Sequence, residues 1–225
     1  MRVARVAVIG VLAGVAGASV GERAGPRSFE IVTRMEIDVD GAPNAYGPPG
    51  KKTLDYLKNA HYRGQPGAEI VGYLTDDDHP NVPIIQGPDD PYPGYYVSTT
   101  HYVDRLRKDR KDPLRYVDAT KINYVVLGDE ARHKGARVGD FVAVYSRRTK
   151  RAVYGIVGDS GNPSGAEGSL HLLQALGYPF TSGKTGTVER REIVVRFFVG
   201  SNPGRMFFRT QGELDRAAEG LGKEF

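Results

Sequence analysis

The chain has 225 residues, with 31 Lys and Arg, 27 Asp and Glu and no cysteine. This length is sufficient for one domain with a hydrophobic core, and the lack of cysteine excludes a disulfide framework, a thiolate nucleophile and a cysteine-ligated zinc site. The formal charge of +4 includes Arg2 and Arg5 of an N-terminal targeting segment, so the rest of the chain is close to balanced and a nucleic-acid partner is not expected.

The N-terminal residues have the pattern of a signal peptide. Arg2 and Arg5 precede an apolar run over 6–20, and Ala16 and Ala18 supply the small residues of a cleavage site. The run is shorter than the roughly 20 residues that a membrane-spanning helix needs. We therefore expect residues 1–18 to be removed. Residues 19–225 then form a single domain of a secreted, extracellular protein with no membrane partner.

The segment 29–39 is predicted to be a strand that ends in acidic residues. Asp38 and Asp40 alternate along it, so both side chains are expected on one face. Two like charges on one face need solvent, a cation or a substrate amine, which makes Asp38, Asp40 and the following Asn44 candidate substrate-binding residues. A turn-forming role is the alternative, and the remaining ligands of a calcium-binding EF-hand loop are absent.

The remaining elements indicate a β-rich domain. Enrichment in β-branched and aromatic residues predicts strands at 69–74, 95–102, 122–127, 141–146, 151–157 and 189–199. Helices are predicted at 54–60, 167–176 and 211–221, a hairpin turn at 148–150 and a long Pro/Gly/Asp loop at 76–94. Seven short strands with few helices favour a mainly β fold with a small closed barrel, a few short helices and long loops, because closure removes exposed strand edges.

The acidic and aromatic residues of the long loop each have two interpretations. Residues 76–78 and 89–90 include five aspartates beside Gly and Pro, and we interpret them as turn residues. The alternative is a cleft that attracts ammonium groups. Tyr92, Tyr95 and Tyr96 follow, and these rings either stack on sugar faces or simply pack.

Asp159 and Glu167 frame a Gly/Pro/Ser loop and are the candidate catalytic residues. One carboxyl group that donates a proton and a second that activates water or attacks carbon are what hydrolysis of a glycosidic bond requires. The structural alternative stays open. Ser164 and Glu167 fit a capping box for the helix predicted at 167–176, and Asp159 fits an ordinary turn residue.

The segment 29–200 resembles the chitosanases of glycoside hydrolase family 75. Six blocks match in the same order, at 36–44, 52–55, 116–127, 138–145, 153–159 and 165–169. By this resemblance Asp159 and Glu167 match the catalytic pair of the family, while Asp118 and Tyr154 lie in matched blocks and are added to the substrate-binding candidates. The resemblance also implies a six-stranded double-psi barrel whose loops form the sugar cleft.

The function that the resemblance implies is a secreted, endo-acting glycoside hydrolase that cleaves β-1,4 linkages of chitosan with inversion. Glu167 as general acid and Asp159 as base follow from it, although a helix N-terminus at Glu167 would stabilise its carboxylate and favour the reverse assignment. We expect a monomer with a polysaccharide substrate and no cofactor. The alternatives are a peptidoglycan hydrolase or lytic transglycosylase on the same barrel, and a non-catalytic polysaccharide-binding module.

Metal chemistry is not indicated by the histidines. Their positions have no spacing typical of metal ligands, so we expect no metal site and interpret all five as surface or structural residues: His61, His79, His101, His133 and His171.

Overall fold

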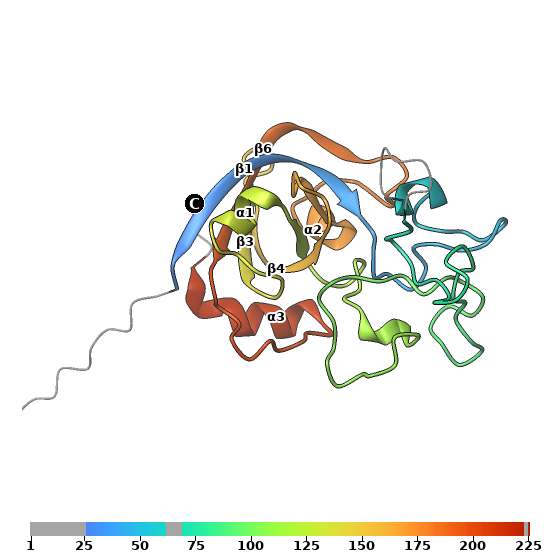
Figure 1. Ribbon diagram of the computed structural model, residues 1–225. Coiled ribbons are helices and arrows are strands. Elements are labelled where there is room, and N and C mark those ends of the chain that lie inside the picture. Colours follow the sequence, from blue (N-terminus) through green and yellow to red (C-terminus); the bar gives the residue numbers. More distant parts are fainter. Residues whose placement is uncertain (1–25, 62–68, 223–224) are drawn as a thin grey trace, which may run out of the picture.

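Six β-strands close into a barrel in the computed structural model, which describes residues 26–61, 69–222 and 225 (Figure 1). Around the barrel they follow the order β1-β5-β2-β4-β3-β6. The pairs β1–β5 and β2–β4 are parallel, and the other four pairs are antiparallel. The strands are β1 (Ser28–Asp38), β2 (Tyr124–Leu127), β3 (Phe141–Ser146), β4 (Ala152–Ser160), β5 (Glu167–Ser169) and β6 (Thr187–Phe198). The predicted fold class, a mainly β protein with a small closed barrel, is confirmed.

Five of the predicted strands correspond to strands of the barrel. The segment 141–146 coincides with β3, and the segments 29–39, 122–127, 151–157 and 189–199 overlap β1, β2, β4 and β6. The hairpin predicted at 148–150 joins the antiparallel pair β3 and β4. Lys150 adopts a left-handed backbone conformation there, with φ of 60°. Enrichment in β-branched and aromatic residues therefore identified five of the six barrel strands, and β5 was missed because it lies in the helix predicted at 167–176.

Two predicted strands, 69–74 and 95–102, are wrong. They form only isolated bridges, such as the pair Tyr73 and Ser98. Aromatic residues favour strands because they pack on a pleated surface, but here Tyr73 and Tyr96 pack on each other, with ring centroids 5.0 Å apart. The aromatic content of these segments serves ring packing instead of strand pairing.

The helices are short. They are α1 (Asp129–His133), α2 (Leu170–Ala175), α3 (Gln211–Ala218) and the 3-10 turns η1 (Leu57–Ala60), η2 (Pro113–Arg115) and η3 (Glu219–Leu221). The helix predicted at 211–221 is confirmed as α3 followed by η3, and the one predicted at 54–60 is reduced to η1; α1 was not predicted. Across the described residues, no helix has the length and apolar character needed to cross a membrane. The predicted signal peptide, 1–18, lies outside the described residues.

The start of the helix predicted at 167–176 is wrong, and so is its capping box. Glu167 begins β5, which pairs with both β1 and β2. The helix begins only after Ser169, whose hydroxyl accepts a hydrogen bond from the amide of Leu172 at 3.1 Å. Ser164 instead hydrogen-bonds Asn162 and the amide of Ala166. Pairing with two strands has overridden the local capping preference.

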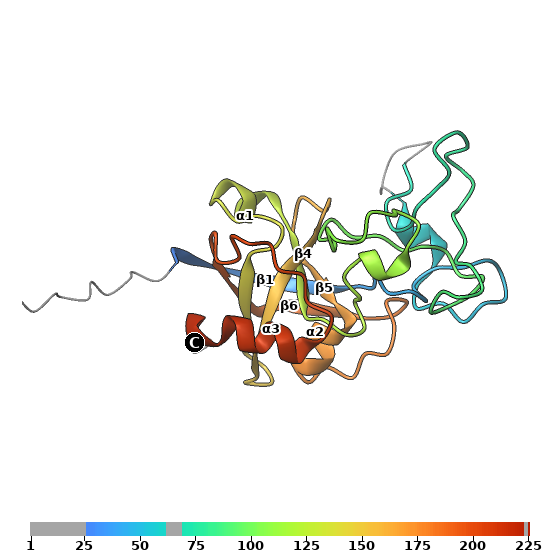
Figure 2. The same cartoon turned by 90° about the horizontal axis from the view of Figure 1, so that it is seen from below.

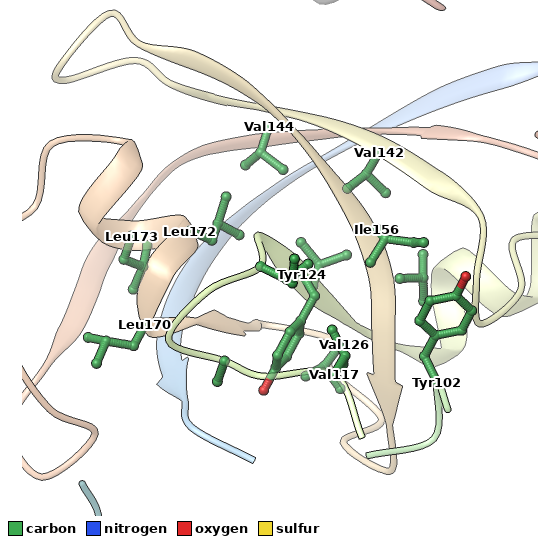
Figure 3. Close-up of a cluster of buried hydrophobic side chains, with 14 of the residues drawn as sticks. Tyr102, Val117, Tyr124, Val126, Val142, Val144, Ile156, Leu170, Leu172 and Leu173 are labelled. Carbon is green, nitrogen blue, oxygen red and sulfur yellow. The ribbon is translucent and has the colours of Figure 1, made fainter. Parts of the chain in front are cut away.

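The hydrophobic core fills the barrel and extends under α2 (Figure 3). Val142 and Val144 of β3, Ile156 of β4 and Leu172 and Leu173 of α2 are all fully buried. Full burial of a side chain of this size stabilises the fold by about 1.5–3 kcal/mol. The barrel is therefore a well-packed scaffold.

The long connection between β1 and β2, residues 40–121, forms a second region that we call the loop layer. It lies at one end of the barrel, near the tip of β1, in both views (Figures 1 and 2). Its described part contains η1, η2 and five isolated β-bridges but no strand of the barrel. The predicted loop at 76–94 falls within it. At the junction between barrel and loop layer lie four of the acidic residues named above, Asp38, Asp40, Asp159 and Glu167.

Candidate active site

A cleft of about 1310 Å³ lies between the barrel and the loop layer. The barrel contributes Asp38 of β1, Val126 of β2, Asp159 of β4 and Glu167 of β5, and the loop layer contributes His101. Strands β1, β2 and β4 end and β5 begins beside this cleft, so carboxylates distant in sequence share one wall.

Strand register brings the two candidate catalytic residues to the same level. Val126 pairs with Asp159 on one side. On the other side Val125 pairs with Gly168 in antiparallel register, which places Glu167 beside Val126. With neighbouring strands about 4.8 Å apart, the Cα atoms of Asp159 and Glu167 are separated by about 10 Å. Both residues and Val126 line the cleft.

Two glycines hold the connection between these carboxylates against β2. A Cβ atom on Gly128 would lie 2.6 Å from the backbone nitrogen of Gly165, and the reverse contact is equally close. Only glycine permits this approach, because real Cβ atoms do not come so near to backbone. The amide of Asp129 also donates to the carbonyl of Pro163 at 2.8 Å. The loop is therefore fastened where β2 ends.

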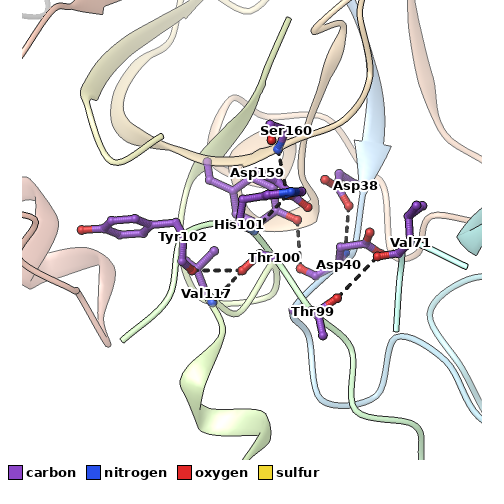
Figure 4. A network of polar contacts seen from close by, with 12 residues as sticks. Asp38, Asp40, Val71, Thr99, Thr100, His101, Tyr102, Val117, Asp159 and Ser160 are labelled. Carbon is purple, nitrogen blue, oxygen red and sulfur yellow. Dashed lines mark hydrogen bonds and ion pairs between the residues drawn. The ribbon is translucent and has the colours of Figure 1, made fainter. Parts of the chain in front are cut away.

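Asp159 is 6% exposed, and three donors converge on its Oδ1 (Figure 4). They are the amide of Ser160 at 2.7 Å, the amide of His101 at 3.0 Å and the Nδ1 of His101 at 2.5 Å. The hydrogen bond to Asp159 raises the pKa of the His101 imidazole, against the opposing effect of burial. The histidine side chain remains 63% exposed, so part of the ring faces the cleft.

Asp38 lies beside this pair at the end of β1. Its Oδ1 accepts a hydrogen bond from the amide of Asp40 at 2.8 Å. Burial raises the pKa of Asp38 well above its ordinary value, and the charges of Asp159 and Glu167 raise it further. The carboxyl groups of Asp38, Asp159 and Glu167 therefore interact through their charges.

Asp40 shares this environment. Burial raises its pKa, and the neighbouring Asp38 and Asp159 add to the effect. Two tyrosine hydroxyls stabilise the turn, because Tyr46 donates to Oδ1 of Asp40 at 2.7 Å and Tyr124 donates to its carbonyl at 2.9 Å. Burial raises the pKa of both tyrosines, so they remain protonated donors. The raised pKa values of Asp38 and Asp40 mean that these two neighbouring residues do not both ionise readily. Such a pair can present a protonated carboxyl group beside a carboxylate.

The structure does not bring the other three predicted substrate-binding residues to the cleft. The carbonyl of Asn44 accepts a backbone hydrogen bond within the loop layer, and Asp118 caps a turn by accepting from the amide of Thr120. Tyr154 is buried in β4, where its hydroxyl donates to the carbonyl of Glu219 at 3.3 Å. None of the three is among the residues that line the cleft. These three residues therefore make structural contacts, although their matched blocks also contain residues that line the cleft.

The cleft is strongly acidic although the chain as a whole is basic. Of the described residues that line it, four are Lys or Arg, namely Arg34, Lys58, Arg110 and Lys184. Nine are acidic, namely Glu36, Asp38, Asp40, Asp55, Glu69, Asp76, Asp77, Asp159 and Glu167. A concave surface lined by one sign of charge concentrates ligands of the opposite sign. The arrangement therefore favours a cationic ligand.

One exposed aromatic ring in the cleft was missed by sequence reasoning. Tyr56 is 48% exposed and lines the cleft, whereas Tyr92, Tyr95 and Tyr96 are not among the lining residues. Tyr96 packs on Tyr73, and Tyr92 packs edge-on against Tyr95. Tyr56 is therefore the exposed tyrosine ring among the described lining residues, and the ammonium groups of Lys58 and Lys184 each lie 5.3 Å from its centroid.

His101 was also missed as a site residue. It is 58 residues distant from Asp159 in sequence, and no motif connects the two. Its interpretation as a surface or structural histidine did not foresee a contact with the candidate catalytic carboxylate. Within 26–61, 69–222 and 225, no group of three or more His, Cys, Asp or Glu side chains is arranged to hold a metal ion.

Fold and site together define a small closed β-barrel protein with a carboxylate-rich cleft at one end of the barrel. A scan against models of protein families finds no match to this chain, and a search of curated proteins finds none with significant similarity. The case for a function therefore depends on the cleft itself and on the resemblance described above.

Proposed function

We propose that the protein is a secreted, endo-acting glycoside hydrolase that cleaves β-1,4 linkages of chitosan by acid/base catalysis. One observation carries the proposal. Asp159 and Glu167 lie on either side of Val126 at one level of the barrel, in the wall of an acidic cleft. A pair of carboxyl groups at the scissile bond is the catalytic requirement of glycoside hydrolysis.

The contacts of Asp159 support its role as base, which leaves the role of acid to Glu167. Oδ1 of Asp159 accepts three N–H groups, an environment suited to a carboxylate, which accepts hydrogen bonds without donating. The argument for the reverse assignment required a helix N-terminus at Glu167, but this residue begins a strand. The inverting outcome enters the proposal from the resemblance, and it requires a water molecule between the sugar and the base.

The size and charge of the cleft support a polymeric, cationic substrate. Its volume of about 1310 Å³ exceeds the roughly 300–1,000 Å³ typical of pockets for small ligands. Glucosamine units of chitosan carry ammonium groups, which the excess of acidic over basic residues in the cleft would attract. No observation favours the peptidoglycan or binding-module alternatives, and we treat them as outcomes of the test.

The test is release of reducing ends from chitosans of graded acetylation, with peptidoglycan in parallel. We expect activity on chitosan, and a loss of about 10²–10⁴-fold in kcat for Asp159→Asn and for Glu167→Gln, because each removes one proton-transfer group. The matched controls are Asp89→Asn and Glu189→Gln, which change exposed residues outside the cleft and should retain activity.

The outcomes separate the alternatives. Full activity in either cleft variant would remove that residue from the mechanism. Release from peptidoglycan alone would keep the chemistry but change the substrate. Binding to chitosan without release of reducing ends would identify a binding module and overturn the proposed hydrolase.

A further inference from the structure

We propose that His101 is a positioning residue for Asp159, which fixes Oδ1 of the carboxylate so that Oδ2 faces the attacking water. This inference rests on the proposed function, because it assigns a partner to its catalytic base. It also gives the loop layer a direct part in catalysis.

All hydrogen bonds to the Asp159 carboxylate converge on one oxygen. The ring and the backbone amide of His101 and the amide of Ser160 reach Oδ1 at 2.5, 3.0 and 2.7 Å. Among the described residues, none donates to Oδ2. Three donors on one oxygen restrict rotation of the carboxyl group. A catalytic group that is already held in its reactive orientation increases the rate, because less orientational freedom is lost in reaching the transition state.

His101 is itself held against the barrel. The amide of its neighbour Tyr102 donates to the carbonyl of Gly158 in β4 at 2.9 Å. On the other side, the hydroxyl of Thr100 donates to the carbonyl of Tyr102 and accepts from the amide of Val117 (Figure 4). The imidazole is thus positioned by a segment of the loop layer that is hydrogen-bonded to the barrel, while the His101 side chain remains 63% exposed.

When it is protonated, the ring also introduces a positive charge beside a group of acidic residues. The charged groups that face it are Asp159 of β4 and Arg132 of α1, and Asp38 and Asp40 lie beyond Asp159. The hydrogen bond to Asp159 raises the pKa of His101, whereas burial and Arg132 lower it. A protonated ring beside a carboxylate favours its charged form, and a carboxylate without such a neighbour takes up a proton at higher pH.

Two substitutions separate the hydrogen bond from the charge. His101→Ala removes both, and we expect kcat to fall about 10–100-fold with little change in KM. His101→Asn keeps an N–H donor close to the position of Nδ1 but cannot carry charge. We expect it to recover kcat to within several-fold of the unsubstituted protein. In both variants the acid limb of the kcat/KM profile should move to higher pH.

The matched control is His133→Ala, which changes an exposed histidine of α1 that is not among the lining residues and should leave kcat and the pH profile unchanged. Titration of the imidazoles by NMR adds a readout that does not depend on turnover. The resonance missing in His101→Ala identifies the ring, and its pKa should fall in Asp159→Asn.

The failures are distinguishable. If the unsubstituted protein cleaves neither chitosan nor peptidoglycan, the proposed function fails and this role fails with it. If it cleaves chitosan and Asp159→Asn does not, but His101→Ala keeps both kcat and the acid limb, only the positioning role is overturned. A lower melting temperature in His101→Ala with unchanged kcat would likewise reduce His101 to a structural contact.

Discussion

The barrel and the loop layer are held together by different interactions. In the barrel, six strands pair continuously around a core whose central side chains are fully buried. The described part of the loop layer has only isolated bridges, and its order depends on tyrosine packing and on side chains that bind backbone groups. The barrel supplies the two candidate catalytic carboxylates, and the loop layer supplies His101 and the exposed ring of Tyr56. The barrel thus carries the candidate catalytic carboxylates, and the loop layer adds a histidine that contacts one of them and a surface for recognition.

The contrast leads to different expected consequences of mutation. Loss of a buried side chain in the barrel should lower the stability of the whole domain, because the core is shared by all strands. Loss of a hydrogen-bonding side chain in the loop layer should open that layer locally and leave the barrel folded.

The largest effect on stability is expected for Leu172→Ala. Leu172 is fully buried in α2, and removal of such a side chain costs about 2–5 kcal/mol through lost burial and the cavity left behind. For a chain of this size the midpoint of thermal unfolding should fall by several degrees or more. Circular dichroism in the far ultraviolet is the measurement. A change below about 1 °C would show that the core under α2 is not shared with the barrel.

A smaller and local effect is expected for Gln86→Ala. The side-chain amide of Gln86 is buried, donates to the carbonyls of Pro43 and Tyr96 and accepts from the amide of Tyr92. Its loss leaves these backbone groups unpaired, and each buried unpaired group costs about 1–3 kcal/mol. Hydrogen exchange should therefore increase in the loop layer.

The barrel is the internal control for that experiment. Amides of β3 and β4 should keep their protection in Gln86→Ala, whereas in Leu172→Ala they should exchange faster together with the rest of the domain. Equal loss of protection in both regions of Gln86→Ala would show that barrel and loop layer unfold as one unit. That result would contradict local opening of the loop layer.

The same contrast explains how much could be predicted from the sequence. Strands such as β3 were predicted because buried β-branched residues leave a strong local pattern. Glu167 was assigned to a helix although it begins β5, since the local capping signal at Ser164 gives no information about pairing with β1. The contact between His101 and Asp159 could not be predicted, because it depends on how the loop layer folds over the barrel. Asp118 was misplaced for the same reason.

The smallest effect we predict is a gain in stability, for Asp38→Asn. Burial and the charges of Asp159 and Glu167 raise the pKa of Asp38 in the folded protein. A carboxyl group whose pKa is raised by folding binds its proton more tightly in the folded state, so its contribution to stability is lost as pH rises through the raised pKa. Near neutral pH the charged group therefore destabilises the fold, and asparagine, which can still accept the hydrogen bond from Asp40, relieves the repulsion.

We expect the melting temperature of Asp38→Asn at pH 7 to exceed that of the unsubstituted protein by about 2–4 °C, which corresponds to about 1 kcal/mol. The gain should shrink as pH falls and vanish below about pH 4, where the aspartate is protonated in both folded and unfolded states. Asp89→Asn, on an exposed part of the loop layer, should show no such gain. A gain that persists at pH 3 would contradict the electrostatic cause. A gain that vanishes, together with weaker cleavage of chitosan, would show that the cleft keeps a destabilising carboxyl group because the substrate needs it.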